Sequence, residues 1–164
     1  MKILTLVRHA KAEDLNTSLT DFERTLTHKG KKQSKFAGEF LRKKNHIPDL
    51  IICSPASRTY QTAALIAVEI PYPKDKIKTD FKIYDSDENS MLELICATNN
   101  NVRHLLLCGH NPTILLLANL LNETKRNHFK KSYVLGLELK INHWIDLFKL
   151  QKGKEKFSFE PEIE

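Results

Sequence analysis

Residues 3–9 read ILTLVRH, an apolar run from Ile3 to Val7 that stops at Arg8 and His9. Two later stretches repeat this arrangement. Leu50 to Cys53 runs into SPASR at residues 54–58, and Leu105 to Cys108 runs into GHNP at residues 109–112. Short continuous apolar runs are typical of strands that are buried on both faces, as in parallel sheets covered by helices. We therefore predict that these three runs are strands of a mainly parallel sheet.

Segments with helical patterns alternate with these runs. Residues 27–45, 56–70 and 88–98 carry apolar side chains at helical spacing, and residues 111–122 are largely apolar, as in a helix that packs deep against a sheet. Because strands that alternate with helices are typical of layered folds, we predict an α/β fold. We expect one domain that spans residues 1–164.

The pattern changes after residue 130. Tyr133 to Leu139 and Trp144 to Leu150 are predicted to be strands, with a turn around Asn142 between them. We expect these two strands to pair antiparallel at one edge of the sheet. The stretch from Gly153 to Glu164 is expected to form a short edge strand followed by a frayed tail.

The composition favours a soluble protein with anionic partners. The chain has 164 residues, of which 41% are hydrophobic, and a formal net charge of +6. A positive surface raises the local concentration of phosphates, acidic proteins or nucleic acid, although many lysines fall in residues 27–45, where a solvated helix face is the simpler interpretation. No stretch approaches the roughly 20 apolar residues that a membrane span needs, so we expect no membrane contact.

The cysteines indicate a reducing compartment. Cys53, Cys96 and Cys108 form no CxxC pair and mostly lie inside apolar runs, where a thiol behaves as a small hydrophobic group. We therefore expect a cytoplasmic protein.

The three predicted strands end in side chains that suit a phosphate group. In an open α/β sheet, ligands bind beyond the carboxyl ends of parallel strands. Arg8 and Arg58 offer planar forks of donors that match phosphate oxygens. Ser54 and Asn111 each precede a proline, which predicts N-caps of two helices. A helix N-terminus presents free N–H groups to an anion, so both helices are expected to face the same site.

Two histidines supply the chemistry. A neutral imidazole such as that of His9 is a competent nucleophile toward phosphorus, and a hydrogen bond from its second nitrogen to a backbone carbonyl would fix the tautomer. His110 is expected to donate a hydrogen bond to the phosphoryl oxygens as charge moves in the transition state. Each of these residues alone is weak evidence for a phosphate site, but the three strand ends together are much stronger evidence.

At this point the sequence resembles the histidine phosphatase (phosphoglycerate mutase-like) superfamily, and within it the short SixA-type phosphohistidine phosphatase branch. Four stretches carry the resemblance: LVRHAKA at residues 6–12, RTLTHKG at 24–30, SPASRTYQTA at 54–63 and CGHNP at 108–112. They occur in the family's order, and the chain length also matches the short branch. Ala10 stands where the superfamily most often has glycine, a change that the short branch tolerates.

The resemblance implies a fold and a set of roles. The fold is a three-layer α/β/α sandwich with a mainly parallel central sheet. His9 is the phosphorylated nucleophile, Arg8 and Arg58 are phosphate ligands, and His110 is the second histidine of the pocket. No metal or organic cofactor is implied. Arg24, Thr27 and Gly30 recur in the branch's pattern, and we interpret them as mainly structural, with Thr27 as a helix N-cap.

A general acid is not evident. Larger superfamily members place an acidic residue in a mid-chain insertion, which this sequence does not accommodate. Asp85, Asp87 and Glu88 lie in the corresponding region, but we interpret them as an N-cap and first-turn acids of the next helix. Because the imidazole of a phosphohistidine leaves readily once it is protonated, a site without an acid suits a phosphoramidate substrate.

We therefore predict a monomeric phosphatase that hydrolyses phosphohistidine on a protein. A phosphatase of small phosphomonoesters that uses the same residues is the main alternative, and a mutase is less favoured. A non-catalytic basic module that binds phosphorylated or nucleic-acid partners is an alternative of another class, although no nucleic-acid motif supports it. Metal-dependent hydrolysis through His9 and His110 lacks a carboxylate partner in the sequence near either histidine.

Overall fold

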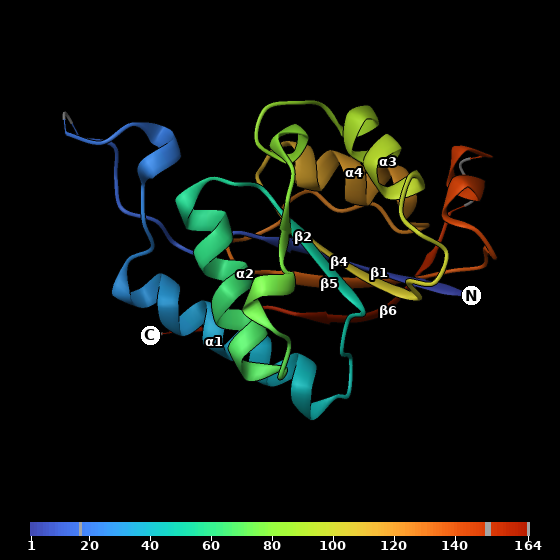
Figure 1. Ribbon diagram of the computed structural model, residues 1–164, viewed down its shortest axis with the longest axis horizontal. Coiled ribbons are helices and arrows are strands. Elements are labelled where there is room, and N and C mark those ends of the chain that lie inside the picture. Colours follow the sequence, from blue (N-terminus) through green and yellow to red (C-terminus); the bar gives the residue numbers. More distant parts are fainter. Residues whose placement is uncertain (17, 150–151, 164) are drawn as a thin grey trace.

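A six-stranded mixed sheet forms the centre of the protein (Figure 1). The computed structural model describes residues 1–16, 18–149 and 152–163. The spatial order of the strands is β3-β2-β4-β1-β5-β6. The first four strands are parallel to one another, β5 is antiparallel to β1, and β6 is antiparallel to β5. Their bounds are β1 Lys2–Arg8, β2 Leu50–Cys53, β3 Lys78–Thr79, β4 His104–Gly109, β5 Val134–Leu139 and β6 Lys154–Phe159. The mainly parallel sheet is confirmed.

Helices cover both faces of the sheet, so the predicted three-layer α/β/α sandwich is also confirmed. Two helices, α1 (His28–Lys43) and α2 (Ser57–Glu69), pack on one face. The other face is covered by α3 (Glu88–Cys96) and α4 (Thr113–Leu121). None of the helices in the described parts of the chain is both long and apolar enough to cross a membrane.

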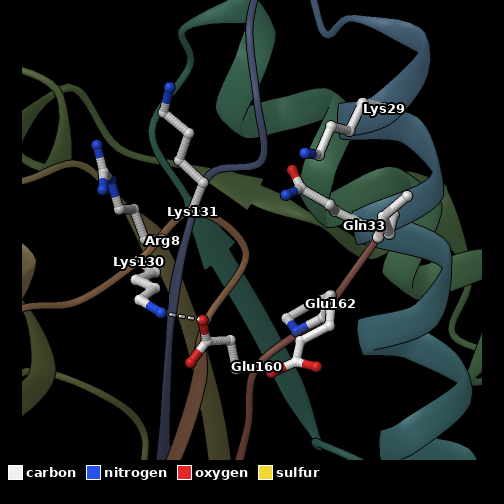
Figure 2. Close-up of a pocket in the computed structure, with 9 residues that line it drawn as sticks. Arg8, Lys29, Gln33, Lys130, Lys131, Glu160 and Glu162 are labelled. Atoms are coloured by element: carbon white, nitrogen blue, oxygen red, sulfur yellow. Dashed lines mark hydrogen bonds and ion pairs between the residues drawn. The ribbon is translucent and has the colours of Figure 1, made fainter.

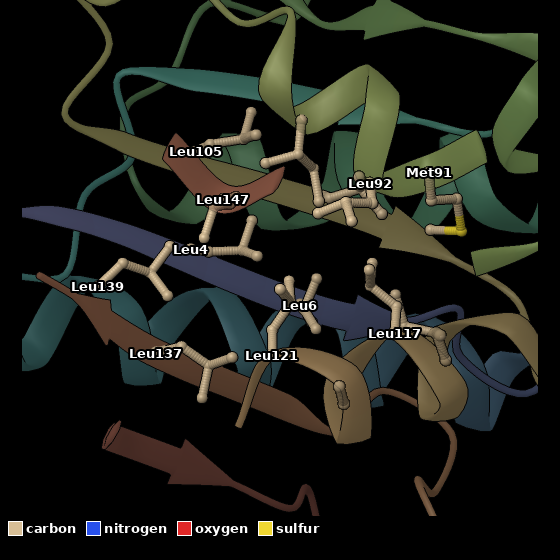
Figure 3. Close-up of a cluster of buried hydrophobic side chains, with 14 of the residues drawn as sticks. Leu4, Leu6, Met91, Leu92, Leu105, Leu117, Leu121, Leu137, Leu139 and Leu147 are labelled. Atoms are coloured by element: carbon tan, nitrogen blue, oxygen red, sulfur yellow. The ribbon is translucent and has the colours of Figure 1, made fainter. Parts of the chain in front are cut away.

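Strand β4 shows why the central strands are continuously apolar. Every residue of β4 is buried, but alternate side chains enter different cores. Leu105 and Leu107 pack with α3 and α4, whereas Leu106 and Cys108 pack with α1 and α2. Figure 3 shows the first of these cores, where Leu4 and Leu6 of β1 meet leucines from the surrounding elements. Both faces of the strand therefore need apolar residues.

The prediction of a strand at Trp144 to Leu150 is wrong. Trp144–Lys149 forms a 3-10 helix (η4), and Leu150 lies outside the described residues. The Trp144 ring is fully buried and its Nε1 donates to the carbonyl of Val102 at 2.9 Å. Strand β5 pairs antiparallel with β1 on one side and with β6 on the other, which confirms the edge strand expected after Gly153.

Two predicted N-caps are also wrong. Helix α2 begins at Ser57 with Ala56 as its N-cap residue, and α4 begins at Thr113 after Pro112, with no side-chain cap at either. The hydroxyl of Ser54 instead lies 2.8 Å from Nε2 of His110, and Nδ2 of Asn111 donates to the carbonyl of Phe129 at 2.9 Å. By contrast, Thr27 caps α1 as predicted, because its side chain accepts from the N–H of Gly30 at 3.0 Å.

Three further 3-10 helices connect the larger elements: η1 Asp21–Glu23, η2 Lys74–Lys76 and η3 Phe81–Ile83. The segment that contains η1 lies between β1 and α1 and extends beyond the carboxyl end of the sheet (Figure 1). It brings Asp21 to residues that are far away in the sequence. The three cysteines are buried and free.

Candidate active site

The carboxyl ends of β1, β2 and β4 meet at one edge of the sheet. Arg8 pairs in register with Gly109, and Cys53 pairs with Cys108. The residues that follow these strands therefore lie side by side, as expected of a parallel sheet. The structure in this way brings together all four side chains that the sequence singled out: His9 lies beside His110, Arg58 contacts His110, and the charge of Arg8 acts on both histidines.

His9 lies at the centre of this site and is mostly buried. Its Nδ1 is 2.8 Å from the carbonyl oxygen of Ala10, and because a carbonyl only accepts, Nδ1 carries the proton. Within the described residues, Nε2 has no hydrogen-bond partner. Burial, followed by the charges of nearby groups including His110 and Arg58, lowers the pKa of His9 to about 3 despite the opposing bond to Ala10. His9 is therefore neutral at pH 7, with a free lone pair on Nε2.

His110 lies next to His9, with a distance of 5.2 Å between the ring centroids. Its Nδ1 is 3.2 Å from Nη2 of Arg58, which can only donate, so Nδ1 accepts and Nε2 carries the proton. Nε2 is then the donor to the hydroxyl of Ser54 at 2.8 Å. Burial and the charge of Arg58 lower the pKa of His110 to about 4. The hydroxyl of Thr59 also lies 3.2 Å from Nε2, so a direct bond from His110 to a phosphoryl oxygen requires that Nε2 give up its hydroxyl contacts.

Two arginines supply the positive charge. Arg58 is almost fully buried, and its Nη1 donates to the backbone carbonyl of Asp21 at 2.8 Å. Arg8 donates from Nη1 to the carbonyl of Phe129 at 3.0 Å. The Nε atoms of both arginines are buried without a partner. A buried donor without a partner raises the free energy of the folded protein, and an anionic ligand that accepts from it removes this cost. Both guanidinium groups therefore have a free donor for an anion.

Asp21 is a site residue that the sequence interpretation missed. Its carboxylate accepts from Nη2 of Arg58 at 3.1 Å, from Nη2 of Arg24 at 2.8 Å and from the hydroxyl of Tyr84 at 3.0 Å. Partial burial acts to raise its pKa, but the hydrogen bonds from Arg24 and Tyr84 and the charge of Arg58 outweigh it and lower the pKa. Asp21 is thus an ionised group that holds Arg58 in place. Its position three residues before Arg24 is the only local indication of this role.

Backbone contacts fix the end of β1. The N–H of Ser132 donates to the carbonyls of Arg8 and His9, at 3.0 and 3.2 Å, from a residue with a φ of 59°. Thr62 on α2 accepts from the N–H of Ala10 at 3.0 Å and donates to the carbonyl of Arg58 at 2.8 Å. These contacts tie the end of β1 to α2 and to the residues before β5. Neither residue was assigned to the site from sequence.

The candidate acids have structural roles. Asp87 caps α3, because its side chain accepts from the N–H of Ser90 at 2.8 Å, and Glu88 lies in the first turn of α3. Asp85 is exposed. Over the described ranges, none of the three makes a hydrogen bond or ion pair with His9 or His110. Among those same ranges, no group of three or more histidine, cysteine and acidic side chains is arranged to hold a metal ion.

Comparison with known proteins agrees with the family resemblance of the sequence. A sequence model of the Histidine phosphatase superfamily (branch 1) matches residues 4–80, which include Arg8, His9 and Arg58. An uncharacterised protein of Mycobacterium tuberculosis is 30% identical over 112 residues, which make up 68% of this chain and 67% of that protein.

Solved structures share the fold. One, assigned as the phosphohistidine phosphatase SixA of Nakamurella multipartitia, superposes with a TM-score of 0.83 at 24% identity and covers 98% of this chain and 96% of its own. The protein histidine phosphatase SixA in complex with tungstate superposes with a TM-score of 0.79 at 19% identity, and the match covers 95% of each chain.

Proposed function

Because the chain belongs to the histidine phosphatase superfamily, we propose that it hydrolyses phosphohistidine on a protein through a covalent intermediate on His9. One observation carries this proposal: Nδ1 of His9 donates to the carbonyl of Ala10, which leaves the Nε2 lone pair free on a ring that lies beside His110 and in the field of Arg58 and Arg8. Arg8 and Arg58 then act as phosphate ligands.

In the first step, Nε2 of His9 attacks the phosphorus atom of the substrate. A new P–N bond forms to Nε2, while the P–N bond to the substrate histidine breaks. The His9 ring becomes positively charged, and its Nδ1 proton stays bound to the carbonyl of Ala10. The substrate imidazole carries a proton on its other nitrogen at the start, so it leaves as a neutral ring. No proton has to come from the enzyme.

The arginines stabilise the transferred group. Charge spreads over the three equatorial oxygens during phosphoryl transfer, and donors already fixed in place stabilise it without reorganisation. Arg58 is fixed by Asp21 and His110, and Arg8 is fixed by Phe129. His110 thus acts on the phosphoryl group chiefly through Arg58.

In the second step, water attacks the phosphorus atom of phosphorylated His9. The P–N bond breaks and its electron pair returns to Nε2, which regenerates the neutral ring. Inorganic phosphate leaves with both protons of the water molecule. The proton on Nδ1 of His9 does not move in either step.

The acidic groups around the site support a phosphoramidate substrate. An alcohol leaving group has a high pKa and needs a proton, but Asp21 is ionised and held by two arginines. Asp87 caps a helix instead. The SixA structures of the same fold are described as phosphohistidine phosphatases, which agrees with this choice of substrate.

The test compares substrates on the same protein preparation. A phosphotransfer domain phosphorylated on histidine and a panel of small phosphomonoesters are supplied in turn, and the release of inorganic phosphate is measured. We expect kcat/KM to be highest for the phosphotransfer domain. A phosphomonoester that is turned over much faster contradicts the assignment of the substrate and favours the small-molecule alternative.

A variant pair assigns this activity to the site. His9→Ala removes the nucleophile and is expected to abolish phosphate release. His143→Ala changes an exposed histidine in the loop before η4 and is the matched control. Full activity in His9→Ala contradicts the proposed mechanism for either class of substrate.

A further inference from the structure

A second cationic pocket lies beside the candidate active site. It is a cavity of about 540 Å³ between α1, the loop before β5 and the last residues of the chain (Figure 2). Lys29 lines it from α1, and Lys130 and Lys131 line it from the loop. Arg8 forms part of its wall, so the pocket adjoins the site through a proposed phosphate ligand. We call this cavity the tail pocket.

A short segment after β6 lines the tail pocket. Residues Glu160 to Ile163 lie along its floor, with Pro161 buried. The carboxylate of Glu160 is 2.5 Å from Nζ of Lys130, and Glu162 lies beside it in Figure 2. The hydrogen bond and charge of Glu160 raise the pKa of Lys130. A segment with two carboxylates therefore lines this pocket, and one of them, Glu160, is already paired with Lys130.

Positive charge remains in excess despite this segment. Among the lining residues, four cations (Arg8, Lys29, Lys130 and Lys131) face two carboxylates, Glu160 and Glu162. Burial, followed by the charges of Arg8, Lys11 and Arg24, lowers the pKa of Lys131. Lys131 and Arg8 line the same cavity, so Lys131 lies near the candidate site. A cationic field that extends from the site into the tail pocket attracts substrates with further negative charges.

We propose that the tail pocket binds carboxylate side chains of the substrate protein that flank its phosphorylated histidine, and that the segment Glu160 to Ile163, which already pairs with Lys130, competes with them for the cations of the pocket. This inference rests on the proposed function for the identity of the substrate. The tail competes with a high effective concentration because it belongs to the same chain. Only a partner segment that binds the pocket more tightly than these two glutamates displaces them, so weakly acidic partners do not bind there.

A binding measurement tests the pocket without relying on catalysis. The probe is a fluorescent, unphosphorylated peptide rich in glutamate, and its anisotropy is titrated with the protein at low salt. In Glu160→Gln/Glu162→Gln the competitor loses its charge while the tail keeps its length and shape, so we expect binding at least about threefold tighter than in the wild type. In Lys130→Gln/Lys131→Gln we expect binding at least about threefold weaker.

The matched control uses an ion pair elsewhere on the sheet. Lys156 and Glu138 form a similar exposed pair, at 2.7 Å, on β6 and β5. Lys156→Gln and Glu138→Gln change the net charge in the same directions, by one unit instead of two, and are expected to leave peptide binding within error of the wild type. Urea unfolding of each variant shows that it is folded, and Lys29→Gln replaces the double lysine variant if that variant is not.

The outcomes separate this inference from the proposed function. Equal peptide binding by the wild type and the folded lysine variants overturns the tail pocket, even if the protein hydrolyses phosphohistidine. The predicted order of affinities supports the tail pocket, even if no phosphohistidine substrate is turned over. With an active enzyme, KM for a phosphohistidine peptide with acidic flanks should rise in the lysine variants, whereas KM for a neutral peptide should not.

Discussion

At the scale of single residues, the fixed proton on His9 determines what the site can do. A solvated histidine has a pKa of about 6.5 and is partly protonated near neutral pH. Burial keeps His9 neutral, and the carbonyl of Ala10 selects the tautomer in which Nε2 is free. As the proposed nucleophile, His9 therefore needs no separate general base. The same burial requires the surrounding polar groups to be held by protein contacts.

Asp21 provides those contacts for Arg58, which leads to a prediction. In Asp21→Asn the backbone bond to Arg58 persists, but the charged bonds to Arg58 and Arg24 are weakened. Charge-assisted hydrogen bonds contribute about 1.5–3 kcal/mol, so we expect kcat/KM to fall by roughly tenfold. Loss of the negative charge also makes the site more positive, which favours phosphate binding. This effect is smaller than the loss of the hydrogen bonds, because the Asp21 side chain is 40% exposed and water screens its charge.

Steady-state kinetics check this prediction, with Asp75→Asn in η2 as a control at an exposed position. We expect the control to match the wild type. An Asp21→Asn variant that is as active as the wild type would show that Arg58 does not need its carboxylate partner.

The sequence could predict His9, His110, Arg8 and Arg58, because each follows an apolar strand in a local context that suits phosphate. It could not predict Asp21, whose partners Arg58 and Tyr84 are 37 and 63 residues away. Ser132 likewise acts through its backbone N–H on Arg8 and His9, and no side-chain pattern indicates such a contact. Residues whose partners are far away in the sequence cannot be predicted from local patterns in a single sequence.

At the scale of elements, Gly30 shows how a helix is seated beside the site. A Cβ atom at this position would lie 2.0 Å from the carbonyl oxygen of Lys11, which also accepts from the N–H of Thr27. The first turn of α1 therefore packs directly on the backbone that follows His9. Glycine is needed here because of this close approach.

Gly30→Ala should consequently destabilise the protein, despite the higher helix propensity of alanine. We expect the free energy of unfolding to fall by about 1–3 kcal/mol, as for other overpacked positions, with a loss of activity as the loop after His9 moves. Urea unfolding measures the first effect. Lys32→Ala on the exposed side of the same helix is the control, with a change expected within about 0.5 kcal/mol. Equal stability of the two variants would contradict this packing argument.

Local patterns predicted most elements but not all of them. The strands β1, β2 and β4 were predicted because both of their faces are buried and apolar. The 3-10 helix at Trp144–Lys149 resembles a strand in composition, and the tertiary contacts of Trp144 with Val102 and Asn100 decide its form. Ser54 has the sequence context of an N-cap, but its hydroxyl bonds to His110. In both cases a distant partner overrides the local preference.

At the scale of the whole molecule, three buried histidines couple folding to pH. Burial is the main cause that lowers the pKa of His9 to about 3 and the pKa values of His104 and His110 to about 4. In the unfolded chain each titrates near 6.5, so below that pH the unfolded state binds more protons than the folded state. The stability that these groups provide is complete above pH 6.5 and is lost as the pH falls toward 4.

We therefore expect the free energy of unfolding to decrease between pH 7 and pH 5. Each histidine that is protonated only in the unfolded state contributes a slope of about 1.4 kcal/mol per pH unit. Urea unfolding at several pH values measures the total, and His104→Gln, which lies away from the site, should reduce the slope. A stability that does not change across this range would mean that these histidines take up protons while the protein stays folded.

The central claim is that His9 carries the phosphoryl group, and trapping the intermediate tests it most directly. The protein is mixed with a phosphorus-32-labelled, histidine-phosphorylated phosphotransfer domain and quenched in alkali within milliseconds, and the labelled peptide is identified by mass spectrometry. We predict an acid-labile label on His9 that is absent from His9→Ala and retained in His143→Ala. A label on another residue, or a label that persists in His9→Ala, would contradict the mechanism.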